Sequence, residues 1–77
     1  MEYKLRYFGQ LQDLTGTAEE TINHKFKTIG GLRALIIERY PKLSNINFKI
    51  AQNNSIDKDS SPINGTLIDF LPPFSGG

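Results

Sequence analysis

The residues best suited to chemistry are the last six of the chain: Pro72, Pro73, Phe74, Ser75, Gly76 and Gly77. Two consecutive prolines restrict φ and supply no backbone donor, so a preceding strand is not expected to continue through them. Six extended residues reach roughly 20 Å at about 3.3 Å each, and two glycines can pass through a narrow channel. We therefore expect an arm at residues 72–77 that carries the carboxylate of Gly77 into the pocket of a partner.

Other side chains offer little chemistry of their own. The chain has no cysteine, which removes disulfides, thiolate nucleophiles and thiolate metal ligands. His24 is the single histidine, and Asp57, Asp59 and Asp69 have no convincing catalytic pairing. We expect no metal, no cofactor bound by this chain and no intrinsic hydrolase activity.

Length and composition favour one small domain. The 77 residues are 38% hydrophobic and 22% charged, which is ordinary for a soluble protein. A net charge of +1 gives no electrostatic reason to bind nucleic acid or an anionic membrane. No apolar run approaches the ~20 residues of a membrane span, and the first residues do not start a signal peptide. We expect a cytoplasmic protein with a domain at residues 1–71 and the arm at 72–77.

Hydrophobic periodicity predicts a small set of elements. Alternation indicates strands at residues 3–8, 19–27, 47–52 and 66–71. Ile56 anchors a short bridge strand, and residues 10–17 are expected to form a loop. Thr28 is a suitable N-cap for a helix over residues 29–40, which Pro41 ends. A single helix packed on a mixed sheet is a two-layer α+β fold.

The arm and the strand before it carry the most specific motif. Residues 71–77, Leu-Pro-Pro-Phe-Ser-Gly-Gly, resemble the C-terminus of the small subunits of molybdopterin synthase, which are sulfur carriers of the ubiquitin-like β-grasp superfamily. Residues 7–16 resemble the family's first strand and following loop, and residues 38–41 resemble its helix end. The chain departs from the family at Gln12, where a basic residue is frequent, and at residues 64–66, where Asp-Gly-Asp is frequent. Both departures bear on partner contacts.

The resemblance implies a reaction cycle centred on Gly77. A ubiquitin-activating-type enzyme consumes ATP to adenylate the terminal carboxylate, and a sulfur donor protein then converts it to a thiocarboxylate. The arm enters the large subunit of the synthase, within a heterotetramer, and delivers sulfur to the pterin precursor. A terminal carboxylate with a pKa of about 3.5 is an anion and a poor electrophile at neutral pH, which agrees with the need for adenylation. Without cysteine, any sulfur carried must sit on the terminal carbonyl.

An apolar patch beside the arm is expected to bind the partner. In a β-grasp the first and last strands are parallel neighbours, so Phe8 and Leu71 should meet on the open sheet face where the arm departs. Ile56 is the third residue assigned to this interface. An apolar patch beside an arm is a reasonable docking site, although single exposed apolar residues are also common without any function.

Three other readings stay open at this point. The nearest alternative is a sulfur carrier for another pathway, such as thiamine, cysteine or tRNA thiolation, although the double proline favours molybdopterin. A ubiquitin-like modifier that forms isopeptide bonds to lysine would use the same Gly-Gly end. The third reading is a plain binding module with an inert tail.

Overall fold

The computed structural model describes residues 1–73, and a five-stranded sheet forms its centre. The strands are β1 (Glu2–Tyr7), β2 (Glu19–Asn23), β3 (Lys49–Gln52), β4 (Ser55–Asp57) and β5 (Leu67–Leu71). All four predicted strands and the bridge strand at Ile56 are confirmed. The predicted second strand ends at Asn23 rather than at residue 27.

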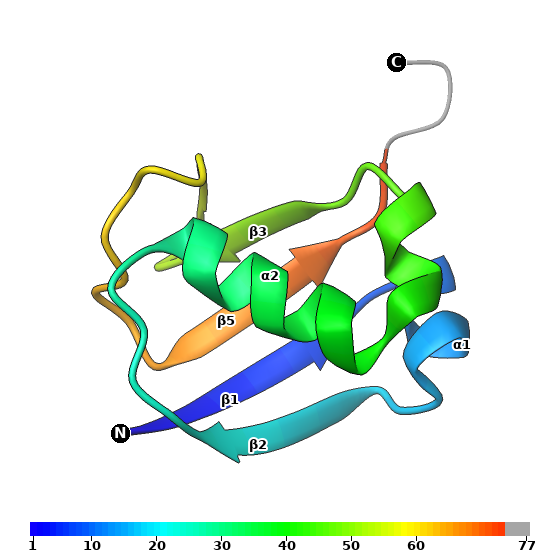
Figure 1. Cartoon of the computed structure of the whole chain (residues 1–77), viewed down its shortest axis with the longest axis horizontal. Helices are drawn as coiled ribbons and strands as arrows, with labels where there is room; N and C mark the ends of the chain where they lie inside the picture. The colour runs from blue at the N-terminus through cyan, green and yellow to red at the C-terminus, as the bar shows by residue number, and fades with distance from the viewer. Residues whose placement is uncertain (74–77) are drawn as a thin grey trace.

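The sheet is mixed, with the first and last strands at its centre. The strand order is β2-β1-β5-β3-β4, and the parallel pair is β1 with β5 (Figure 1). The other three neighbouring pairs are antiparallel. The parallel pairing of the first and last strands was an expectation from the resemblance, and the register confirms it.

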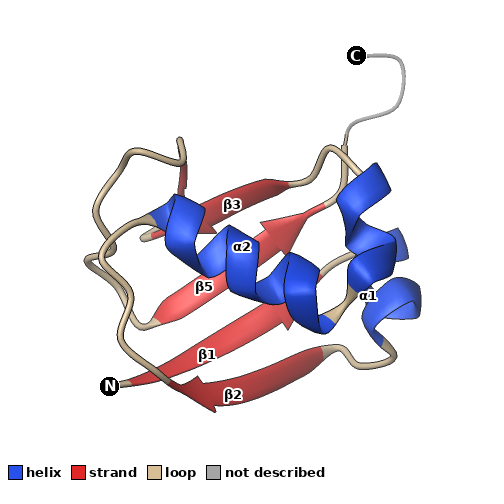
Figure 2. Cartoon of the chain, in the orientation of Figure 1, coloured by secondary structure: helices blue, strands red, loops and turns tan. Residues whose placement is uncertain are grey.

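One face of the sheet is covered by α2 (Ile29–Arg39), which crosses in front of the strands (Figure 2). Its N-cap is Thr28, whose hydroxyl accepts a hydrogen bond from the Gly31 backbone N–H at 3.2 Å. The helix buries Leu32 and Ile36 completely. Their spacing of four residues puts both on the stripe that faces the sheet.

Strand alternation supplies the other half of the core. The residues that point toward α2 are fully or almost fully buried: Tyr3, Leu5, Tyr7, Ile22, Ile50, Ile68 and Phe70. Because successive side chains of a strand point to opposite faces, the residues between them form the face that α2 leaves uncovered. We call this uncovered surface the open face.

Two short helical segments differ from the sequence expectation. Residues predicted as a loop contain α1 (Gln10–Thr15), which buries Leu11 at the end of the sheet. Pro41 ends α2 as predicted but also begins a 3₁₀ helix, η1 (Pro41–Asn45), which buries Leu43. Helices this short have almost no stability of their own and form only because tertiary packing holds them. Segments of six and five residues are also too short to show a repeated helical spacing of apolar residues, so the sequence did not predict them.

The described residues contain no candidate for a transmembrane helix. None of the helices within residues 1–73 combines the length and the apolar character that crossing a bilayer requires.

Candidate functional site

Pro72, the first residue of the predicted arm, follows the end of the parallel central strands β1 and β5. Tyr7 lies opposite Phe70 in the register, and the Phe8 backbone N–H donates to the Phe70 carbonyl at 3.1 Å. The next residue on the last strand is Leu71, where β5 ends. Phe8 and Leu71 therefore lie side by side, as the sequence predicted, immediately before the chain reaches Pro72.

Gly9 lies directly against the first residue of the arm. Its φ of 56° and ψ of −135° belong to a region that residues with a side chain rarely adopt. A Cβ added at Gly9 would lie 3.0 Å from Cγ of Pro72. The glycine thus permits two things at once: the turn from β1 into α1 and the close approach of Pro72. No local pattern in the sequence marks Gly9 as special.

The expected site residues lie at different places. Pro72 is half-buried and Pro73 is exposed, so the root of the arm is described. Phe74, Ser75, Gly76 and Gly77 lie outside the described residues. The division into a domain at 1–71 and an arm at 72–77 therefore stays a prediction.

The three residues predicted for the partner interface share the open face but do not form one contact. Phe8 is 39% exposed and Leu71 is half-buried beside it. Ile56, which is 51% exposed, lies on β4 and is separated from β5 by β3. At about 4.8 Å per strand, that is roughly 10 Å away. Ile56 instead lines a hollow of about 570 Å³ at the β4 side of the sheet, together with Lys49 and Lys58.

The open face also carries one exposed apolar residue that was not predicted. Leu67 is 44% exposed and lies opposite Lys4 in the parallel register. Its signal was present, because positions 67, 69 and 71 of a strand share a face whenever Leu71 is assigned outward.

The centre of the open face is an ion pair that the sequence did not predict. Arg6 lies opposite Asp69, and its Nε and Nη2 donate to the two carboxylate oxygens at 2.7 and 2.9 Å. This bidentate arrangement is the strongest form of an arginine–carboxylate pair, and the hydrogen bond to Asp69 raises the pKa of Arg6. The guanidinium carbon also lies 5.6 Å from the centre of the Phe8 ring. Asp69 lacked an obvious partner in the sequence. In the structure each of its carboxylate oxygens accepts a hydrogen bond from Arg6.

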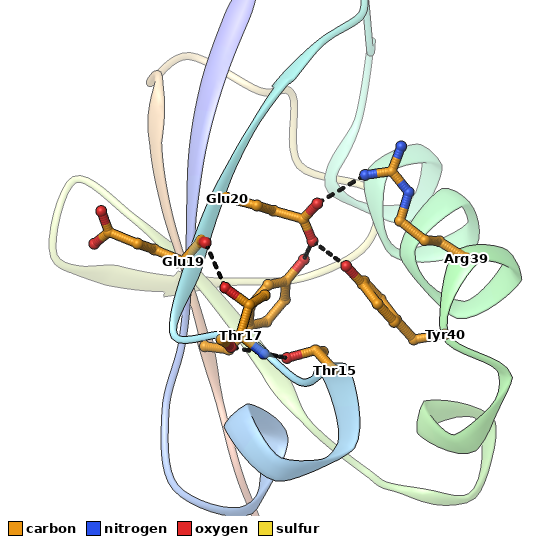
Figure 3. Close-up of polar contacts among 7 residues, drawn as sticks. Thr15, Thr17, Glu19, Glu20, Arg39 and Tyr40 are labelled. Carbon is orange, nitrogen blue, oxygen red and sulfur yellow. Dashed lines mark hydrogen bonds and ion pairs between the residues drawn. The ribbon is translucent and has the colours of Figure 1, made fainter.

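A second polar cluster joins β2 to the C-terminal end of α2 and is drawn in Figure 3. The hydroxyls of Tyr7 and Tyr40 each donate to Oε2 of Glu20 at 2.6 Å, and Arg39 donates to Oε1 at 2.8 Å. Burial would raise the pKa of Glu20, but the hydrogen bonds from the two tyrosines and the charge of Arg39 outweigh it and lower that pKa.

Perturbed pKa values can mark a catalytic site. In this cluster, however, the two tyrosines and Arg39 all donate their hydrogen bonds to Glu20. Burial and the hydrogen bonds to Glu20 raise the pKa of both tyrosine hydroxyls, which keeps them protonated donors. We conclude that the cluster fastens β2 to α2. Within residues 1–73 there is also no group of three or more side chains suited to hold a metal ion.

The fold defines the class of protein. A mixed sheet of this order, crossed by one main helix and with its last strand beside its first, is the ubiquitin-like β-grasp fold, as predicted. Residues 5–77 match the ThiS family, and the chain belongs to that family.

Named relatives make the likeness more specific. The "Molybdopterin synthase sulfur carrier subunit" of Caenorhabditis briggsae is 34% identical over 80 aligned positions, which cover 96% of this chain and 95% of the relative. The resemblance found in the sequence is confirmed by this relative and by the family match.

Two solved structures are similar over essentially their full length. The "Putative molybdopterin converting factor, subunit 1" from Pyrococcus furiosus has a TM-score of 0.83 at 21% identity, covering 96% of this chain and 99% of that one. At this identity the likeness shows the fold alone. A chain in the complex of subunits 1 and 2 of the molybdopterin-converting factor from Helicobacter pylori has a TM-score of 0.67 at 28% identity, with 100% of both chains covered.

Proposed function

We propose that this chain is the sulfur-carrying small subunit of a molybdopterin synthase. The observation that carries the proposal is the 34% identity, over 96% of the chain, to a protein named as the sulfur carrier subunit of that enzyme. The match to the ThiS family over residues 5–77 supports the same class.

The proposed chemistry takes place on Gly77 and is catalysed by partner proteins. A carboxylate oxygen of Gly77 attacks the α-phosphorus of ATP in an activating enzyme, and pyrophosphate leaves. The terminal sulfur of a persulfide on a donor protein then attacks the acyl carbon, and AMP leaves. A thiol of the donor protein attacks the resulting acyl disulfide, which releases the thiocarboxylate and leaves a disulfide on the donor. The thiocarboxylate formed is the species that donates sulfur to the pterin precursor. Adenylation is needed because a carboxylate with a pKa of about 3.5 is an anion at neutral pH.

The geometry of the domain agrees with this role. The arm begins at Pro72, directly beside Phe8 and Leu71, so an apolar surface lies next to its root. We propose that the large subunit of the synthase docks on this end of the open face and receives the arm in its active site. The complex of subunits 1 and 2 from Helicobacter pylori supports a two-component assembly. A heterotetramer with two copies of each subunit is the assembly we expect.

Intact-protein mass spectrometry tests the proposal directly. The chain is incubated with ATP, a cognate activating enzyme and a sulfur donor, and the mass of Gly77 is read after fragmentation. We expect one oxygen to be replaced by sulfur at that residue. A chain that lacks Gly77 is the control, which should fold normally, remain unmodified and fail to support cofactor production.

The result also separates the alternatives. An unmodified Gly77, with an activating enzyme shown to be active, would contradict sulfur carriage and favour a plain binding module. Conjugates to lysine in cell extracts would instead indicate a ubiquitin-like modifier. A thiocarboxylate that forms but is not consumed by the large subunit would point to thiamine, cysteine or tRNA thiolation.

A further inference from the structure

The open face combines an apolar end with a charged centre. Across the sheet, the register places Ile56 opposite Ala51, Ala51 opposite Asp69, and Asp69 opposite Arg6. The side chain of Arg6 is 38% exposed and that of Asp69 is 20% exposed, so neighbouring groups already shield the pair partly from water. A partner that covers Phe8 and Leu71 would complete this desolvation, because position 6 lies two residues from Phe8 on the same face.

The pair has zero net charge but is not saturated with hydrogen bonds. A guanidinium has five N–H donors, and Arg6 uses two of them on Asp69. The other three have no acceptor among residues 1–73. A covering partner must therefore offer oxygen acceptors to avoid burying unpaired donors. An additional carboxylate or ammonium group there would be a desolvated charge without a counterion, which is unfavourable.

We propose that the Arg6–Asp69 ion pair selects the partner of the open face. The pair stays closed in the docked complex and fits a surface that is electroneutral at this point and presents hydrogen-bond acceptors, such as backbone carbonyls, to the guanidinium. Surfaces that bring a charge against the pair are rejected. This inference rests on the proposed docking of the large subunit, and it adds a determinant of specificity to it.

The test is a double-mutant cycle on binding to the purified large subunit of the molybdopterin synthase from the same organism, measured by calorimetry. Arg6→Met leaves the Asp69 carboxylate unpaired in the interface, and Asp69→Leu leaves the guanidinium unpaired. Each single variant should weaken binding roughly 30-fold or more. The double variant should bind more tightly than either single variant, because no unpaired charge is then desolvated.

A neighbouring ion pair provides the matched control. Lys4 and Glu19 lie 3.3 Å apart on the same face but are 53% and 54% exposed. Lys4→Met should change the dissociation constant by less than about threefold, as expected for a solvated pair. Glu19 is left unchanged in this control, because it lies opposite Arg6 in the register of β1 and β2 and its charge acts on the guanidinium. Thermal unfolding of every variant checks that losses in binding do not reflect loss of the fold.

The salt dependence of binding tests the electroneutral contact. Wild type and the double variant should show the same change in dissociation constant with salt, since a closed pair facing neutral acceptors adds no charge pairing across the interface. A steeper dependence for wild type would show that the partner supplies a counter-charge, and would overturn the proposal.

Two other results would also overturn it. Single-variant losses that add up in the double variant would show that the pair is not coupled in the complex, while the proposed function would stand. A chain that acquires the thiocarboxylate but does not bind the large subunit would refute the docking and this inference, and would leave sulfur carriage intact.

Discussion

Gly9 is the residue on which the root of the arm depends most directly. It turns the chain from β1 into α1 with a positive φ, and it leaves room for Pro72, whose ring would lie 3.0 Å from any added Cβ. Both requirements favour glycine, the only residue without a Cβ. A side chain there would strain the turn and displace Pro72 from its position against Gly9.

We predict that Gly9→Ala destabilises the domain by about 1–3 kcal/mol and slows sulfur loading of Gly77. Thermal unfolding and the mass-spectrometric loading assay measure the two effects. Gly16→Ala is the control, because Gly16 also has a positive φ, of 80°, but an added Cβ would meet nothing within 4 Å. It should lose stability yet load at the wild-type rate. Equal loading rates in the two variants would show that Gly9 does not position the arm.

Glu20 is the residue that joins the edge strand to the main helix. Its carboxylate accepts hydrogen bonds from Tyr7, Tyr40 and Arg39, and these lower its pKa in the folded state although burial opposes them. A group with a lowered pKa stabilises the fold above its ordinary pKa of about 4.3. That stabilisation is lost as the pH falls through the folded-state value.

Glu20→Gln should therefore lower the free energy of unfolding by about 1–3 kcal/mol at neutral pH. The difference from wild type should shrink as the pH is lowered from about 7 to about 2, because a protonated Glu20 resembles glutamine. Urea unfolding of both proteins across this range measures it. A difference that stays constant with pH would show that the charge on Glu20 does not stabilise the fold.

At the scale of elements, the first turn of α2 is built from two glycines with different surroundings. An added Cβ at Gly31 would meet only the Thr28 hydroxyl, at 3.7 Å. An added Cβ at Gly30 would lie 3.2 Å from both Cβ and the backbone oxygen of Asp59. The Gly30 N–H also donates to that oxygen at 2.9 Å, so the loop lies tightly against the helix at this point.

We predict that Gly31→Ala stabilises the domain by about 0.5–1 kcal/mol, because alanine loses less backbone entropy than glycine on entering a helix. Gly30→Ala is the matched control and should give no gain, since the loop carrying Asp59 must move. Chemical denaturation of the two variants measures the free energies of unfolding. A gain of the same size in both would mean that the contact with Asp59 is not tight in solution.

At the scale of the whole molecule, the two faces of the sheet have different surroundings. Its covered face packs α2 and supplies the core, and its open face carries Phe8 and Leu71 beside the root of the arm. The parallel pairing of β1 with β5 is what places these residues together. The proposed docking of the large subunit and the proposed delivery of sulfur therefore fall at the same end of the domain.

Phe8→Asp should weaken binding of the large subunit by about 10–100-fold, as expected for an aromatic residue central to an interface. It should change the stability little, because Phe8 is 39% exposed and lies outside the buried core. Leu67→Asp is the matched change on the same face but toward the other end of β5. It should weaken binding of the large subunit less than Phe8→Asp does. Equal losses would place the partner over the whole face rather than beside the arm, and an unchanged affinity for Phe8→Asp would refute docking there.

The sequence by itself determined the elements that depend on neighbouring residues. The alternation in residues 3–8 and 66–71 identifies their strands and faces, and Thr28 with Pro41 bounds the main helix. The C-terminal motif at residues 71–77 identified the family. Each of these signals can be recognised from residues close together in the sequence, because hydrophobic periodicity, helix capping and the restriction of φ by proline act over a few positions.

Only the tertiary structure decided the contacts between distant residues. Arg6 and Asp69 are 63 positions apart and meet because burying both central strands fixes their parallel register. Glu20 finds Tyr40 only once α2 lies across the sheet, and Gly9 meets Pro72 only where β1 and β5 end together. The helix at residues 10–15 and the 3₁₀ helix likewise exist because Leu11 and Leu43 fill the core. Such contacts follow from packing of the whole chain, which no local pattern encodes.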